Sequence, residues 1–204
     1  MTLRLRTRAF RVEHATIGAA LLRPYWKRYD ATLADTLGWS LSITCSEREF
    51  DGESWQPEFN FERFALPIER WWDLEQLTTS VEGGTAYVVG HGPVGRTELS
   101  FGQRRGSSLQ LTCRGECDVD WDDEFGRGVP YTIETRVQFE GIRVVGTSTD
   151  DDDSLRAFLQ AHFQLDGLRE TACEESGTPA RSKEKMIAKL FLPGRVARAG
   201  RSPS

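Results

Sequence analysis

Alternation between apolar and polar residues dominates the middle of the chain. In LGWSLSITC, residues 37–45, every second residue is apolar, and the same period recurs in SLQLTC, residues 108–113, and YTIETRVQF, residues 131–139. A period of two is typical of a strand that buries one face. Other strand-like runs are PEFNFERF, TAYVVG, TELSFG and GIRVVGT. Because the connections are mostly too short for crossover helices, we expect a mainly antiparallel sheet, with a tight hairpin turn at Glu140-Gly141.

Two segments have the period of an amphipathic helix instead. Residues 67–84 begin with a proline suited to the first helical position, carry apolar residues at helical spacing and stop at two glycines. Residues 153–167 carry apolar residues at i, i+3, i+4, i+7 and i+8, after an N-cap at Asp153 or Ser154. The predicted fold class is therefore α+β, a mainly antiparallel β-sheet meander with two amphipathic helices packed on it.

Length and charge distribution suggest the domain organisation. The chain has 204 residues, which fits one domain with an appendage. Its net charge is -5, but residues 1–168 are acidic whereas residues 169–204 are basic and mostly polar. We therefore predict a single α+β domain over residues 1–168 and a basic, mostly disordered C-terminal tail over residues 169–204.

Composition bears on whether the protein binds a membrane or nucleic acid and on the cell compartment in which it is expected. No run approaches the roughly 18 apolar residues of a membrane span, and the start of the chain has no signal-peptide core, so we expect a cytoplasmic protein that does not bind a membrane. An acidic body argues against a nucleic-acid binder, which needs a basic footprint. The four cysteines do not form a disulfide framework.

Two motifs resemble functional sites but fit structural roles better. GHGPVG, residues 90–95, matches a dinucleotide-binding fingerprint, yet a strand-like run follows where the mechanism needs a helix, so we expect a hairpin loop. Cys113 and Cys117 lie on the apolar phase of a strand, which favours the core over a zinc site. No nucleophile, base and orienting group stand out together, so we predict no catalytic residues and no cofactor.

An acidic segment with one tryptophan is the strongest candidate for a site. Concentrated charge speeds association with an oppositely charged partner, and a central aromatic is a common anchor. A calcium loop starting at Asp118 fails, because Asp123 stands where glycine is needed and Val129 where a closing glutamate is needed. A two-metal site on alternate carboxylates and a plain solvated loop stay open as alternatives. The segment consists of Glu116, Asp118, Asp120, Trp121, Asp122, Asp123 and Glu124, together with the residues between them.

The order of predicted elements resembles a known family. A Tyr-Asp pair at 29–30 precedes a strand with Trp, Leu and Ile alternating at 39–43, then come an acidic and aromatic helix, a strand meander and a closing L..FL..HF helix. Over residues 29–168 this layout is similar to the WapI-type immunity proteins of bacterial contact-dependent toxin systems. The resemblance implies a non-catalytic cytoplasmic protein that binds and blocks a toxin domain, often a basic nuclease.

The residues and the resemblance together give one main hypothesis. We expect a non-catalytic binding protein, an immunity-type inhibitor that neutralises a basic toxin domain through the acidic segment. The alternatives are a metal-dependent enzyme that uses the carboxylates of residues 118–123, and a structural or complex-assembly protein.

Overall fold

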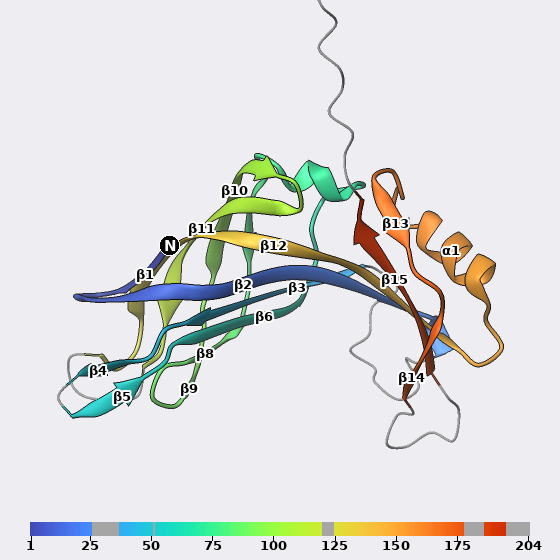
Figure 1. Ribbon diagram of the computed structural model, residues 1–204. Coiled ribbons are helices and arrows are strands. Elements are labelled where there is room, and N and C mark those ends of the chain that lie inside the picture. The colour runs from blue at the N-terminus through green and yellow to red at the C-terminus, as the bar shows by residue number, and fades with distance from the viewer. Residues whose placement is uncertain (26–36, 51, 120–124, 178–185, 195–204) are drawn as a thin grey trace, which may run out of the picture.

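In the computed structural model, thirteen strands among the described residues form a single sheet (Figure 1). The structure describes residues 1–25, 37–50, 52–119, 125–177 and 186–194. A separate hairpin pairs β4 with β5. The strands are β1 (Thr2–Leu5), β2 (Arg8–Leu22), β3 (Gly38–Cys45), β4 (Arg48–Phe50), β5 (Glu53–Trp55), β6 (Glu58–Phe64), β7 (Thr78–Val81), β8 (Thr85–Tyr87), β9 (His91–Pro93), β10 (Thr97–Arg105), β11 (Ser108–Cys117), β12 (Val129–Thr147), β13 (Leu168–Glu170), β14 (Glu174–Gly177) and β15 (Met186–Pro193).

The long strand β12 organises the sheet. The strand order is β7-β10-β11-β12-β1-β2-β3-β6-β8-β9, and β15 also pairs with β12. Along its length β12 lies first beside β11 and β1, then beside β2 and β15. Among the described pairs only β12 with β2 is parallel, so the expectation of a mainly antiparallel sheet is confirmed.

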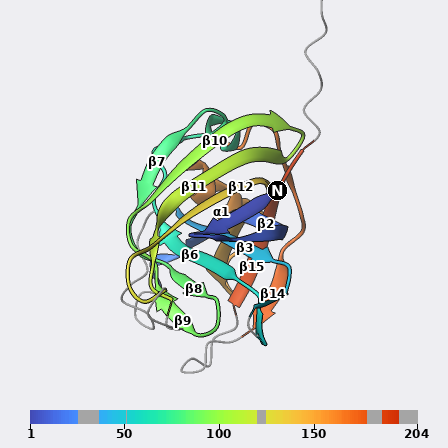
Figure 2. The ribbon, with the colours of Figure 1, turned by 90° about the vertical axis from the view of Figure 1, so that its left-hand side faces the viewer.

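The sheet rolls until its last strand meets β11 (Figure 2). Val94, directly after β9, forms a bridge with Cys117 at the end of β11. The amide of Gly95 donates to the carbonyl of Glu116 at 2.9 Å, and the amide of Asp118 donates to the carbonyl of Pro93 at 3.0 Å. These contacts join β9, the last strand of the path, to β11, its third strand, at the point where the acidic segment begins.

The apolar phase of the alternating strands faces the inside of the rolled sheet. Trp39 of β3 and Phe139 of β12 are buried there, with ring centroids 6.0 Å apart. Trp71 stacks on the same Phe139 ring at 5.2 Å. Cys113 and Cys117 are also buried in this core, as their spacing predicted. Burial of such large rings contributes most of the stabilisation of the fold.

The prediction of two packed helices is wrong, and the fold is dominated by the sheet. Residues 67–84 form only the 3-10 turn η2 (Trp71–Leu74), followed by strand β7, which pairs with β10. The β-branched residues of β7 favour a strand once β10 offers a partner. The second helix exists as α1 (Asp152–Gln160), the only α-helix in the part of the chain that the structure describes. Its N-cap is Asp151, whose side chain accepts from the Ser154 amide at 2.8 Å, rather than the predicted Asp153 or Ser154.

The hairpin turn predicted at Glu140-Gly141 is also wrong. Strand β12 continues through these residues, with a bulge at Gly141 where its register against β2 shifts. The φ angle of Gly141 is 109°, and a Cβ atom there would come within 2.4 Å of the Phe191 carbonyl oxygen. Glycine is therefore required by the backbone of a continuous strand, because β15 passes too closely for a side chain.

Parts of the segment predicted as a tail belong to the sheet. Strand β15 pairs with β12, and β13 and β14 pair with β15. The boundary drawn at residue 168 therefore does not separate these strands from the fold. Residues 178–185 and 195–204 lie outside the described residues.

A buried ammonium group ties β15 to its surroundings. Lys189 of β15 is 3% exposed, and its Nζ atom lies 3.1 Å from Asp152 of α1 and 3.3 Å from Glu170 of β13. The amide of Cys173 also donates to Asp152, at 3.0 Å. A buried cation is tolerated only when carboxylates neutralise it, so this triad fixes β15, β13 and α1 relative to one another.

Candidate functional site: an acidic strand end on the outer face of the sheet

The acidic segment starts at a strand end that is held from both sides. Glu116 and Cys117 pair with Pro130 and Val129 of β12. On the other side, the backbone of Glu116 and Asp118 is hydrogen-bonded to Gly95 and Pro93, at the end of β9. The carboxylates that follow therefore start from backbone that is fixed on two edges.

Two of the predicted site residues can be placed. Glu116 is exposed, whereas Asp118 is half-buried and its Oδ1 atom accepts from the Gly128 amide at 2.9 Å. Because Gly128 lies shortly after the acidic segment, this hydrogen bond links the start of the segment to the chain after it. Asp118 thus has a structural role within the predicted site. The other predicted site residues, Asp120, Trp121, Asp122, Asp123 and Glu124, lie outside the described residues.

The residue after the segment is packed against a cation. Phe125 is buried, and the Cζ atom of Arg8 lies 4.6 Å from its ring centroid. The same guanidinium lies 4.0 Å from the ring centroid of Trp55 and 4.7 Å from that of Phe50. Three aromatic faces around one guanidinium give strong cation–π contact and anchor the chain where it leaves the acidic segment.

The outer face of the sheet leads from the acidic segment to a groove. Residues directly opposite each other in neighbouring strands project from the same face of a sheet. One row of such residues crosses six strands, and the residues next to it in these strands, such as Ile17, Ile43 and Phe59, are buried in the core. The row is Gln138, Thr16, Ser42, Asn60, Thr85 and Pro93, and it ends beside Asp118.

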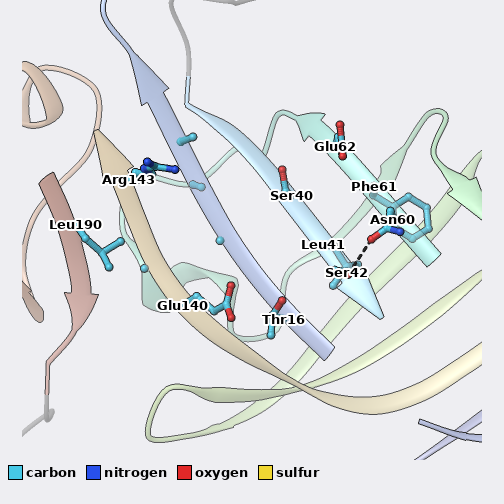
Figure 3. A pocket seen from close by; sticks show the side chains of 14 residues that line it. Thr16, Ser40, Leu41, Ser42, Asn60, Phe61, Glu62, Glu140, Arg143 and Leu190 are labelled. Carbon is cyan, nitrogen blue, oxygen red and sulfur yellow. Dashed lines mark hydrogen bonds between the residues drawn. The ribbon is translucent and has the colours of Figure 1, made fainter. Parts of the chain in front are cut away.

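Small and hydroxyl-bearing side chains line the groove (Figure 3). It lies over β12, β2, β3 and β6 and has a volume of about 590 Å³. Gly18 and Ala20 form an apolar part of its lining, and the Ser42 hydroxyl donates to Asn60 Oδ1 at 2.8 Å. Charged side chains also line it: Glu62, Glu140 and Arg143. The groove therefore offers hydroxyl and amide groups, charged groups and apolar side chains side by side.

A second row lies beside the first and carries an aromatic pair. It consists of His14, Thr44, Glu58, Tyr87 and His91, which are opposite one another on β2, β3, β6, β8 and β9. The rings of Tyr87 and His91 have centroids 5.0 Å apart at 56°. His91 is exposed, as expected for the GHGPVG segment, which forms a hairpin strand rather than a helix start.

The cysteines are not suited to nucleophilic chemistry. Burial raises the pKa of the Cys45 thiol to about 12, and burial together with the nearby Asp118 carboxylate raises the pKa of Cys117 to about 12. Burial also raises the pKa of Cys113. Thiols with such pKa values stay protonated near neutral pH, whereas the nucleophile and the metal ligand is the thiolate.

The described residues contain neither a metal-binding cluster nor a membrane-spanning helix. Among the described residues, no group of three or more His, Cys, Asp or Glu side chains is arranged to hold a metal ion. The aspartates at 120, 122 and 123, on which the metal alternative rests, lie outside those residues. In the same part of the chain no helix is long and apolar enough to cross a membrane.

The chain was compared with protein-family models, with curated proteins and with solved structures, and none of them matches. The likeness to immunity proteins therefore stays a prediction from the order of elements. The sequence reasoning did not single out Tyr87 or the groove. Tyr87 could have been found from TAYVV, where Ala86 and Val88 take the apolar phase and leave the tyrosine on the outer phase.

Proposed function

We propose that the chain is a non-catalytic binding protein, an immunity-type inhibitor that neutralises a basic toxin domain through the acidic segment. The observation that carries the proposal is the attachment of this segment. Its first residues are hydrogen-bonded to β12 and to the residues around β9, and Asp118 ties it to Gly128. Preorganised charge binds with less loss of conformational freedom than charge on a free tail.

The charge of the chain supports a basic partner. The net charge is -5, and the acidic segment concentrates six carboxylates within nine residues around one tryptophan. Such a surface steers a cationic protein toward it and fixes its orientation. The raised pKa values of the buried cysteines favour binding over thiol catalysis.

The test is a binding experiment with matched charge reversals. The full chain serves as bait in a cell lysate at low salt. A captured protein is identified and purified, and its association rate and affinity for the bait are measured at increasing ionic strength. We expect a basic toxin domain whose toxicity is blocked and whose association slows as salt rises. Replacing Asp120 and Asp122 by lysine should weaken binding strongly.

The matched control reverses the same number of charges elsewhere. Glu134 of β12 and Glu174 of β14 are exposed carboxylates away from the acidic segment, and their replacement by lysine should change binding only modestly. Equal losses in both double variants would show that net charge alone acts. A partner that is indifferent to salt and to both variants would refute the acidic-surface proposal.

A further inference from the structure

Tyr87 is an exception among the apolar side chains of this protein. It is 39% exposed, and in the described part of the chain only Met1 among the large hydrophobic side chains is more exposed. Its neighbours Ala86 and Val88 are buried, so Tyr87 takes the outward-facing position of the alternation. Tyrosine is one of the side chains that most often anchor protein interfaces, so this exposed ring is a candidate contact site.

The ring lies on the same outer face as the start of the acidic segment. Tyr87 is opposite His91, and Pro93, two residues further along β9, is opposite Asp118. Side chains two residues apart on one strand point to the same side. The aromatic pair and the half-buried Asp118 carboxylate therefore share one surface, on adjacent strands.

A carboxylate stands directly beside the ring. Glu58 of β6 is opposite Tyr87 of β8 in the antiparallel register, a position that brings the Cβ atoms of two residues to about 5 Å. Tyr87 thus lies between Glu58 of β6 and His91 of β9, the strand that contacts the start of the acidic segment. A ring face next to carboxylates is suited to a guanidinium, which stacks on the ring while its N–H groups donate to the carboxylate oxygens.

The strand that carries His91 packs directly against the start of the acidic segment. Gly92 packs against the backbone of Asp118 so closely that a Cβ atom at position 92 would come within 2.0 Å of the Asp118 carbonyl oxygen. The Val88 amide donates to the Gly90 carbonyl at 3.2 Å and closes the turn between β8 and β9. The ring is therefore held in place before any partner arrives.

We propose that Tyr87 is the aromatic anchor of the partner-binding surface and that it accepts an arginine side chain of the basic partner on its ring, beside Glu58. The inference rests on the proposed function, because it takes Asp118, at the described start of the acidic segment, as part of the same surface. It adds a specific chemistry: the partner is recognised through arginine, and lysine of equal charge is a poorer ligand for this face.

The test uses two synthetic peptides as probes, one of six Arg-Gly repeats and one of six Lys-Gly repeats. Fluorescence anisotropy at low salt measures their binding to the full chain. We expect the arginine peptide to bind several-fold more tightly. Tyr87→Leu should remove most of this preference, whereas Tyr87→Phe, which keeps the ring, should retain it. Tyr25→Leu is the matched control, since Tyr25 packs near Val145, outside the two rows.

The outcomes separate the inference from the proposed function. If Tyr87→Leu leaves the preference unchanged while the Asp120 and Asp122 reversals weaken both peptides, Tyr87 is not the anchor and the acidic surface stands. If the two peptides bind equally to the original protein, the arginine inference is overturned. If neither peptide binds at low salt, the inference and the proposed acidic surface fail together. Thermal unfolding of each variant verifies that it is folded.

Discussion

Gly92 and Asp118 are in backbone contact, and this contact closes the rolled sheet beside the acidic segment. A Cβ atom at position 92 would lie 2.0 Å from the Asp118 carbonyl oxygen, a distance that no side chain can adopt without moving one of the two strands. The two residues are on β9 and directly after β11, so the contact joins the last strand of the path to β11.

Replacing Gly92 by alanine should therefore destabilise the protein. We expect a loss of about 1–3 kcal/mol in the free energy of unfolding, the usual range for overpacking and backbone displacement. Chemical denaturation measures it. Gly90→Ala is the control, because a Cβ atom there meets nothing within 4 Å. An unchanged midpoint for Gly92→Ala would mean that β9 does not close on β11.

Arg8 should contribute more to stability than a surface arginine. Its guanidinium lies over the rings of Trp55 and Phe125, and truncation to alanine removes both cation–π contact and packing. We expect a cost of about 1–3 kcal/mol. Arg11→Ala removes only an exposed pair with Glu13 and should cost less than about 0.5 kcal/mol. Equal costs for the two variants would contradict the packing seen around Arg8.

The Lys189 cluster makes stability depend on pH in acid. Hydrogen bonds from Cys173 and Lys189 hold the pKa of Asp152 below its usual value. A carboxyl with a lowered folded-state pKa contributes stability above its unfolded pKa, near 4, and the contribution is lost as pH falls through the folded value. Stability should therefore drop below about pH 4, and the drop should be smaller in Asp152→Asn. Identical pH profiles for both proteins would contradict this role.

The same cluster acts at the opposite end of the pH scale. Burial lowers the pKa of Lys189, but hydrogen bonds and charge from Asp152 and Glu170 outweigh it and raise the pKa above its usual value. The stability from this pair is present below the unfolded pKa of lysine and is lost as pH rises through the folded value. Lys189→Met should flatten the alkaline side of the stability profile, as measured by thermal unfolding between neutral and alkaline pH.

The thiols should react slowly in the folded protein. Cys45 and Cys117 are buried, with pKa values of about 12, and the pKa of the half-buried Cys173 is raised to about 11, mainly by burial and then by Asp152. At pH 8 we expect slow modification by a thiol reagent in the native state and complete modification after unfolding. Rapid native labelling of Cys117, identified by mass spectrometry, would contradict its burial in the core.

The strands could be predicted from sequence because their alternation is a local property. The runs around Trp39, Leu111 and Ile133 have one apolar phase, and that phase is buried. The helix predicted over residues 67–84 is wrong because the prediction rests on the helical spacing of Trp71 and Leu74. The pairing of β7 with β10 depends instead on residues distant in sequence. Bulges raise the same difficulty: Gly141 reads as a turn until β15 is seen to pass beside it.

The candidate site was only partly visible from sequence, for the same reason. Its charge is local and conspicuous, so the sequence alone singles out Glu116 and its neighbours as a candidate surface. The meeting of β9 with β11 is a long-range event, and only this contact brings Tyr87 and Asp118 onto one face. The groove across β12, β2, β3 and β6 arises from four strands that no local pattern assigns as neighbours.

The parallel pairing of β12 with β2 also bears on synthesis at the ribosome. Thr16 of β2 has Gln138 of β12 as its register partner, so β2 emerges from the exit tunnel long before that partner has been translated. Until then residues 16–22 of β2 have no strand to pair with on one edge, and an unpaired apolar strand is prone to aggregate. The nascent chain should therefore depend on chaperones until β12 emerges, and refolding from denaturant should be slow because these contacts join distant residues.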